Sequence, residues 1–281
     1  QSIFKNTLLL IGLITSIYGV IGAIGAERLR RFVGFMVLSS GGTLLIAIAM
    51  FNTQAWSAGL YYLVHSTLIA AAFYLFCGWS TAQRGTFKDH LKGAPKIKNE
   101  KAAALTYFLI AMMMAGLPPV SGFLGKVFIL QATAETAYQG WIIAIILIVS
   151  LLSILALTRV GFILFWRASP PEIDPNEAAY QTYQGLPAYA PNRNDTAIYI
   201  ILAGLMAYVV FASPIQTYTV LTAQQIQNHA LYNQAILKTD AQGRVISVQP
   251  YDPAYLPETK YGGEVEDHTA VLIPDVLSKA T

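Results

Sequence analysis

The chain has 281 residues, of which 55% are hydrophobic and only 12% charged, and its formal net charge is +3. Soluble domains carry about twice that charged fraction, and so small a positive charge without a basic, aromatic-rich patch excludes a nucleic-acid-binding protein. Several apolar runs approach the ~20 residues that cross a bilayer core of about 30 Å. The composition therefore predicts an all-α, polytopic helical membrane protein that contacts the lipid bilayer and no nucleic acid.

Six membrane-spanning segments are predicted in chain order from the apolar runs. They cover residues 6–25, 32–51, 56–78, 102–134, 140–166 and 196–212. The fourth is interrupted by prolines, and a proline-rich acidic stretch (167–195) before the sixth is expected to be an extended loop. Residues 1–215 are thus expected to form a transmembrane domain. Residues 216–281 are expected to form an extramembrane C-terminal tail, helical at first over 220–237.

Two loops, 26–31 and 80–101, contain a cluster of basic residues: Arg28, Arg30, Arg31, Arg84, Lys88, Lys92, Lys96, Lys98 and Lys101. Two predicted spans separate these loops, so both must lie on the same side of the membrane. The positive-inside rule makes that side cytoplasmic. The short loops 52–55 and 135–139 then face outward, as do both ends of the chain.

The fourth span contains the stretch "GLPPVSGFLGKVFILQA" (116–132). Pro118 and Pro119 have no backbone N–H, so the carbonyls of Met114 and Ala115 lose their helical partners. Pro118 also moves the preceding residue away from helical angles. Unsatisfied backbone in lipid costs several kcal/mol per group, so a break at this depth must be met by protein or water.

A cation lies close to this break in the sequence. Lys126 follows Pro119 by about two helical turns, or roughly 10 Å, and Gly116 and Gly122 add flexibility and close packing. One interpretation is a packing kink with Lys126 extended toward the outer face. The coincidence of break, glycines and cation favours the other, because discontinuous helices with an ionisable group are typical of ion pathways.

His65 is the only histidine inside a predicted span, and Tyr61 stands one turn before it on the same face. An imidazole with an ordinary pKa near ~6.5 exchanges protons at cellular pH. The residues equally fit a neutral histidine that joins two helices. Cys77 has no cysteine or histidine partner for a metal site, and no phosphate-binding loop, dinucleotide fingerprint or nucleophile elbow is present, so we expect no cofactor, no metal and no enzymatic chemistry.

The stretch 116–132 resembles the signature of the proton-translocating, antiporter-like membrane subunits of respiratory complex I, related hydrogenases and Mrp-type cation/proton antiporters. Three other segments are similar to the family's landmarks and follow its order: "RLRRFVGFMVLSSGGTLL" after its basic pair, "YYLVHSTLIAAAFYLF" as its histidine-bearing helix, and "WIIAIILIVSLLSILALTRVGFILFW" as the span after the broken helix. The resemblance covers residues 1–215 and extends weakly further.

Within that family the chain is most similar to the D subunit of the Mrp-type antiporters. Complex I subunits usually carry a lysine four residues after the histidine, where this chain has Ile69, and Arg30 stands where many members have lysine. The family fold has fourteen spans with two inverted five-helix repeats. The resemblance implies that this chain is the second repeat plus the last span. Because it starts with Gln1, we expect a fragment that lacks the first repeat.

The resemblance implies a subunit of a multisubunit Na⁺ (or K⁺)/proton antiporter in the bacterial inner membrane, with other antiporter subunits as partners. Lys126 would take up and release a proton, His65 would relay it, and Arg30 would bias the charge balance. Gly116, Pro118, Pro119 and Gly122 would form the broken helix. Two alternatives remain: a proton-translocating subunit of an NADH-quinone oxidoreductase or hydrogenase, and a scaffold whose charges only fix topology.

Overall fold

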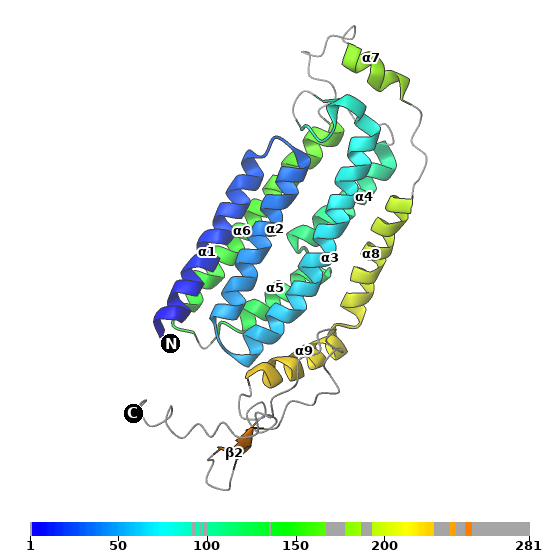
Figure 1. The fold of residues 1–281 in the computed structure, drawn as a ribbon. Helices are drawn as coiled ribbons and strands as arrows, with labels where there is room; N and C mark the ends of the chain where they lie inside the picture. The colour runs from blue at the N-terminus through cyan, green and yellow to red at the C-terminus, as the bar shows by residue number, and fades with distance from the viewer. Residues whose placement is uncertain are drawn as a thin grey trace, which may run out of the picture. The chain divides into compact units, whose positions relative to one another are not determined.

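The computed structural model describes residues 2–91, 94–95, 97, 100–134, 136–166, 178–186, 193–227, 237–239 and 245–248. The chain divides into two compact units, Gln1–Asn228 and His229–Thr281. The first is made of helices (Figure 1). In the second, β1 (Leu237–Thr239) and β2 (Val245–Val248) pair as antiparallel strands, a feature that the sequence did not predict. The nearly all-helical structure confirms the predicted class.

The six predicted spans correspond to helices. These are α1 (Ser2–Gly25), α2 (Leu29–Ala49), α3 (Thr53–Arg84), α4 (Glu100–Ala115) with α5 (Ser121–Gln131), α6 (Gln139–Gly161) and α8 (Arg193–Val210). A 3₁₀ turn (Gly85–Phe87) follows α3, and a π-helical turn (Phe162–Trp166) follows α6. Among the described residues, four helices are each long and apolar enough to cross a membrane: α1, α2, α3 and α6. At 16 and 11 residues, α4 and α5 are each too short alone, as expected of a broken span.

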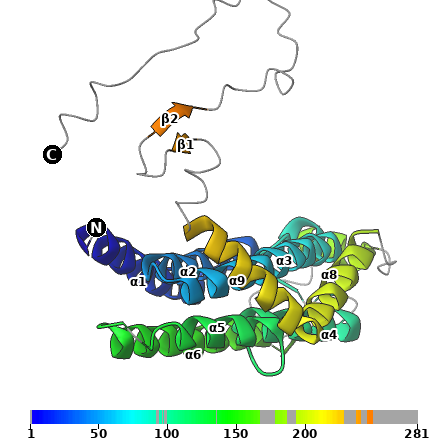
Figure 2. The ribbon, with the colours of Figure 1, turned by 90° about the horizontal axis from the view of Figure 1, so that it is seen from below.

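Helices α1 to α6 form two layers, which Figure 2 shows with the long helices running across the view. Helices α1, α2 and α3 lie side by side, and α4, α5 and α6 pack against them. A close crossing of α1 and α2 depends on small residues, because a Cβ on Gly42 would lie 2.4 Å from the Ser16 nitrogen. At the same crossing, Ser39 Oγ donates a 3.0 Å hydrogen bond to the Ser16 carbonyl. This contact fixes the α2 face that carries Ser39.

Backbone hydrogen bonds join the two predicted basic loops at one end of the bundle. Leu29 N donates to the Asp89 carbonyl at 2.8 Å, and Leu91 N donates to the Glu27 carbonyl at 2.9 Å. Among the basic residues named for these loops, Lys92, Lys96 and Lys98 lie outside the described residues. The loops therefore share one end, as predicted. That this end is cytoplasmic remains a prediction.

Asn52 joins the start of α3 to the end of α5 at the other end of the bundle. Its side-chain oxygen accepts a 2.7 Å bond from Ala55 N and so caps α3, as asparagine commonly does at a helix N-terminus. Its Nδ2 donates to the Ala132 carbonyl at 3.3 Å, just beyond α5. The loop 52–55 thus contacts the residue that follows α5, three positions before the second short loop (135–139), so both loops lie at this end of the bundle.

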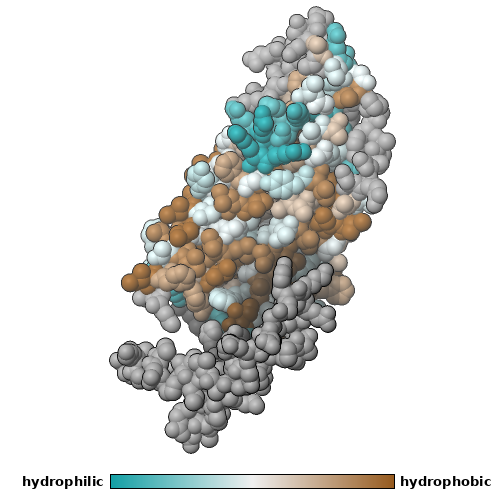
Figure 3. All heavy atoms as spheres, in the orientation of Figure 1, coloured by the Kyte–Doolittle hydropathy of each residue, from teal (hydrophilic) through white to brown (hydrophobic). Residues whose placement is uncertain are grey.

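The outer surface of the helical unit is strongly apolar. Large side chains on α1 and α6 are exposed, among them Ile3 at 81% and Trp141 at 71%. Figure 3 shows extensive hydrophobic surface along the helices, with a hydrophilic patch near the end of the bundle where α2 begins. Such a surface is expected against lipid, where apolar side chains have no reason to turn inward.

The expected domain boundary at 215/216 falls inside α9 (Ala212–Gln227), and the first compact unit continues to Asn228. Helix α9 turns by 81° from α8. It packs on the start of α3, where Ser57 Oγ and Thr219 Oγ1 lie 2.9 Å apart. The predicted helix over 220–237 is confirmed as far as Gln227, and α7 (Ala178–Gly185) interrupts the stretch expected to be extended. The remaining tail lies outside the described residues, apart from β1 and β2.

Candidate functional site

Helix α4 ends at the break in a glycine-based cap. Gly116 has φ +73°, the left-handed conformation that glycine adopts without a steric penalty. Gly116 N donates to the Met113 carbonyl at 3.2 Å, and Leu117 N donates to the Met112 carbonyl at 3.1 Å. This is the bond pattern of a Schellman motif. The helix is therefore terminated just before the prolines, and its carbonyl end points into the break.

Lys126 supplies the missing hydrogen bond at this end of α4. Its Nζ donates to the Ala115 carbonyl at 2.8 Å, the group predicted to lose its helical partner, and to Ser150 Oγ of α6 at 3.0 Å. The side chain thus turns back toward the break instead of extending to the outer face. A cation is also favoured at a helix C-terminus by the helix dipole. Break and lysine form one structural unit.

His65 of α3 contacts the same break. Its Nδ1 is hydrogen-bonded to Ser121 Oγ, the first residue of α5, at 2.8 Å. The imidazole is only 2% exposed and is close enough to Lys126 for the two to interact electrostatically. A Cβ on Gly122 would lie 2.6 Å from both His65 Nε2 and the Met113 carbonyl. Gly122 therefore lets the imidazole reach the break.

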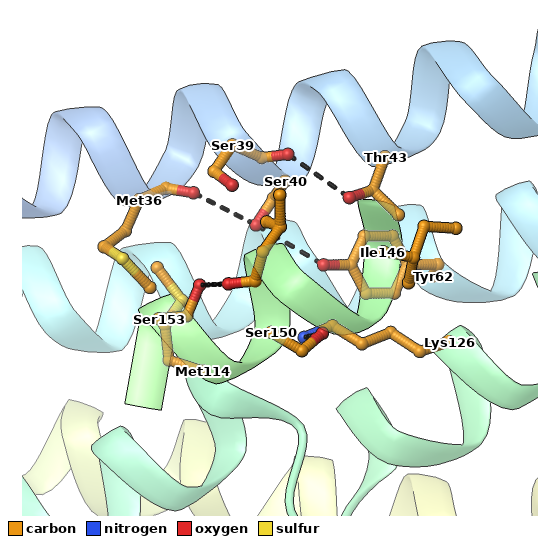
Figure 4. A pocket seen from close by; sticks show the side chains of 11 residues that line it. Met36, Ser39, Ser40, Thr43, Tyr62, Met114, Lys126, Ile146, Ser150 and Ser153 are labelled. Carbon is orange, nitrogen blue, oxygen red and sulfur yellow. Dashed lines mark hydrogen bonds between the residues drawn. The ribbon is translucent and has the colours of Figure 1, made fainter. Parts of the chain in front are cut away.

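A small polar cavity lies beside Lys126. It has a volume of about 10 Å³, room for roughly one water molecule. Hydroxyl groups from three helices line it together with apolar side chains, as Figure 4 shows: Ser39, Ser40 and Thr43 from α2, Tyr62 from α3, and Ser150 and Ser153 from α6. Tyr62 OH donates to Ser40 Oγ at 3.4 Å, a long bond. The lining holds no carboxylate.

The third predicted site residue lies elsewhere. Arg30 is exposed in the first turn of α2, where its backbone N donates to Asp89 Oδ2 at 3.3 Å. Ser40, in the cavity lining, is ten residues further along α2, or about 15 Å. The structure therefore brings Lys126 and His65 together at the break and leaves Arg30 at the loop end of the bundle.

The hydroxyl groups around Lys126 were not predicted as site residues. A signal was present, because Ser39 and Thr43 are four residues apart, and Ser150 and Ser153 three apart, so that each pair shares one helix face. Serine and threonine are common in membrane helices, however, where they pack or bond to their own backbone. Only the structure shows that these faces meet at Lys126. Across the described part of the chain, no group of three or more His, Cys, Asp or Glu side chains could hold a metal ion.

These features define a class: a polytopic helical membrane protein whose core contains a broken helix with a lysine at the break. Residues 1–154 match the family model described as "NADH:quinone oxidoreductase/Mrp antiporter, TM", and the chain belongs to this family. This membership and the apolar helices place the chain in the bacterial plasma membrane as a multi-pass protein.

Individual relatives agree with this assignment. The chain is 29% identical over 227 residues to the D subunit of the Na(+)/H(+) antiporter of Bacillus subtilis (strain 168), a match that covers 80% of this chain and 43% of the relative. It is 28% identical over 183 residues to the D subunit of a probable K(+)/H(+) antiporter of Rhizobium meliloti (strain 1021), covering 55% and 34% of the two chains. The chain thus spans less than half the length of each relative.

A solved structure shares the fold. A chain of the Mrp complex from Dietzia sp. DQ12-45-1b superposes with a TM-score of 0.67 at 22% identity, over 83% of this chain and 49% of that one. The two chains therefore share their helical fold over most of the length of this one.

Proposed function

We propose that this chain is part of a subunit of a multisubunit monovalent cation/proton antiporter, in which it supplies half of a transmembrane ion pathway. Its relatives are named as D subunits of Na⁺/H⁺ and K⁺/H⁺ antiporters. Its partners are then the other subunits of the antiporter, and its role is transport without enzymatic chemistry. The cations carried are Na⁺ or K⁺, exchanged for protons in the service of pH homeostasis.

The observation that carries this proposal is the bond from Lys126 Nζ to the Ala115 carbonyl inside the broken helix. An ionisable group inside a membrane segment is expensive, and it is usually found on ion pathways. Here it lies at discontinuous backbone and beside a hydroxyl-lined cavity, the setting in which transporters bind ions. A lysine that only satisfied the Ala115 carbonyl would need no hydroxyl-lined cavity beside it.

In this proposal each residue has a distinct role. Lys126 binds and releases the transported proton at Nζ. His65 passes protons across the break, because its ring lies between Ser121 of α5 and the Met113 carbonyl of α4. Arg30 acts only through its charge, from the loop end of the bundle.

The test uses the full-length parent protein, expressed with its partner subunits in inside-out membrane vesicles. The vesicles are energised, Na⁺ or K⁺ is added, and the collapse of the pH gradient is followed by a fluorescent probe. We expect the cation-induced collapse to be lost in Lys126→Ala. Lys101→Ala, which removes an exposed lysine from the first turn of α4, is the matched control and should behave as wild type.

Complex assembly is checked by native gel electrophoresis for every variant. An assembled Lys126→Ala complex that still exchanges cations for protons would contradict the proposed role of the lysine and favour a scaffold.

A second candidate is a proton-translocating subunit of an NADH-quinone oxidoreductase. The family description itself includes these proteins, which supports this alternative. Wild-type vesicles that respond to neither Na⁺ nor K⁺, but translocate protons when a quinone-reducing substrate is supplied, would favour it.

A further inference from the structure

One face of α2 changes from cationic to apolar along the helix. Arg30 and Arg31 are exposed in the first turn of α2. Val37 and Leu38, each 38% exposed, follow seven residues later and therefore lie two turns further along the same face. Gly34 is half-buried between the two pairs. The face thus has cations at its start and apolar side chains about 10 Å further along.

The cationic end of this face belongs to a larger basic surface. Arg28 and Lys88 are also exposed there, on the two loops that backbone hydrogen bonds hold together. Asp89 is buried, and its Oδ2 accepts a bond from the Arg30 backbone N at 3.3 Å. Within the described part of the chain, none of the four basic side chains is in an ion pair. Figure 3 shows the hydrophilic patch at this end next to hydrophobic surface.

A hydroxyl group of α3 lies beside the middle of the same face. A Cβ on Gly34 would lie 3.4 Å from the Tyr74 hydroxyl oxygen, so the glycine allows the close approach of this side chain. Tyr74 is 45% exposed, and its hydroxyl makes no hydrogen bond to any other described residue. A phenol O–H is a hydrogen-bond donor. A ligand of the arginines would therefore find a donor about one turn further along α2, at the border with the apolar part.

The order of these groups matches the layers of a phospholipid. A bilayer is about 40–45 Å thick with its headgroups and about 30 Å without them, so each headgroup layer is about 5–8 Å deep. The step of about 10 Å from Arg30 to Val37 therefore leads from the headgroups into the hydrocarbon. Guanidinium groups bind phosphate through paired hydrogen bonds. An acidic segment of a soluble protein would suit the arginines but not the apolar side chains beyond them.

We propose that this face of α2, together with the Tyr74 hydroxyl, binds a phospholipid with an anionic headgroup. The phosphate contacts the guanidinium groups of Arg30 and Arg31, and Tyr74 donates a hydrogen bond to an oxygen of the phosphate or of the adjoining ester. An acyl chain lies along Val37 and Leu38. The inference goes beyond the proposed function and does not depend on it.

Photo-crosslinking of the purified, detergent-solubilised complex tests this inference. The probe is phosphatidylglycerol with a diazirine group on one acyl chain, and labelled peptides are identified by mass spectrometry. We expect labelling of α2 (Leu29–Ala49) that unlabelled phosphatidylglycerol suppresses. Phosphatidylcholine with the same chains should need about a tenfold higher concentration. Glycerol 3-phosphate, which has the phosphate but no chains, should not compete.

Two substitutions with matched controls separate charge from hydrogen bonding. Arg31→Gln should raise the probe concentration for half-maximal labelling about fivefold, the equivalent of about 1 kcal/mol for a basic residue at an anionic surface. Lys101→Gln removes an exposed cation at the same end, on α4, and should not change it. Tyr74→Phe removes only the hydroxyl and should raise it about two- to tenfold. Tyr218→Phe, at an exposed position on α9, should not.

The inference is overturned if phosphatidylcholine competes as well as phosphatidylglycerol, because apolar contact alone would then explain the labelling. Competition by glycerol 3-phosphate would identify a site for free phosphate instead. An assembled complex in which α2 is not labelled would assign this face to a neighbouring subunit. Tyr74→Phe decides the question if Arg31→Gln fails to assemble, and labelling equal to that of Tyr218→Phe would contradict the proposed site.

Discussion

Replacing Gly122 by alanine tests whether the imidazole of His65 must sit against the broken helix. The added Cβ would lie 2.6 Å from His65 Nε2 and 2.6 Å from the Met113 carbonyl oxygen. Ordinary contacts of a Cβ begin at 3.4 Å, so both groups must retreat by about 0.8 Å. A movement of that size away from α5 takes the 2.8 Å contact between His65 Nδ1 and Ser121 Oγ beyond hydrogen-bond range.

The free energy of this change has three parts. Overpacking a core by one methyl group costs about 1–3 kcal/mol. Loss of the buried hydrogen bond costs about 1 kcal/mol more. Alanine gains up to ~1 kcal/mol over glycine in a helix interior, though less this close to the start of α5. We expect Gly122→Ala to destabilise the protein by about 1–3 kcal/mol and to slow cation/proton exchange.

Gly140→Ala is the matched control for this prediction. Gly140 is the second residue of α6, as Gly122 is of α5, and a Cβ there would meet nothing within 4 Å. The control should therefore be neutral or slightly stabilising. The assays are thermal denaturation of the purified complex and exchange in energised vesicles. If Gly122→Ala matches Gly140→Ala in both assays, the imidazole does not depend on the close approach that the structure shows.

Three further substitutions separate the parts of the site. Gly116→Ala forces an alanine into the left-handed conformation at the end of α4 and should lower the free energy of unfolding by about 1–2 kcal/mol, measured as a lower denaturation midpoint. An unchanged midpoint would mean that α4 does not end in this conformation. Asn52→Ala removes the cap of α3 and should cost about 0.5–2 kcal/mol in the same assay, with Asn52→Ser expected to recover most of it through its own capping oxygen. Arg30→Gln should impair exchange less than Lys126→Ala does, because Arg30 does not line the cavity and lies about 15 Å along α2 from Ser40, one of its hydroxyl groups. An equal loss in the vesicle assay would require a direct role for Arg30.

The break itself could be predicted from sequence because its cause is local. Proline removes the backbone donor, so the position of the orphaned carbonyls follows from the position of Pro118. The structure places one of them, the Ala115 carbonyl, against Lys126. The shared end of the basic loops was also predictable, because alternation of spans fixes which loops meet.

What could not be predicted depends on how the helices rotate about their own axes. Helices such as α2 and α6 are apolar on most sides and have weak amphipathic patterns. Their sequences therefore do not indicate which face of the helix is buried. The close crossing of α1 and α2 at Gly42 decides this for Ser39, and the contact with Lys126 decides it for Ser150. The 81° turn after α8 could not be predicted either. The polar contacts of α9 are with the start of α3, which is far away in the sequence.

The arrangement also explains why the proline break and the lysine occur together. Alone, the break would leave the Ala115 carbonyl unsatisfied in a medium without water, and the lysine alone would be an unpaired cation there; each is costly by several kcal/mol. Joined at 2.8 Å, each satisfies the other. A neutral amine at the same position can still donate to the carbonyl, so deprotonation of Lys126 removes the charge and keeps this hydrogen bond. The proton exchange proposed for Lys126 would therefore leave the helix break closed.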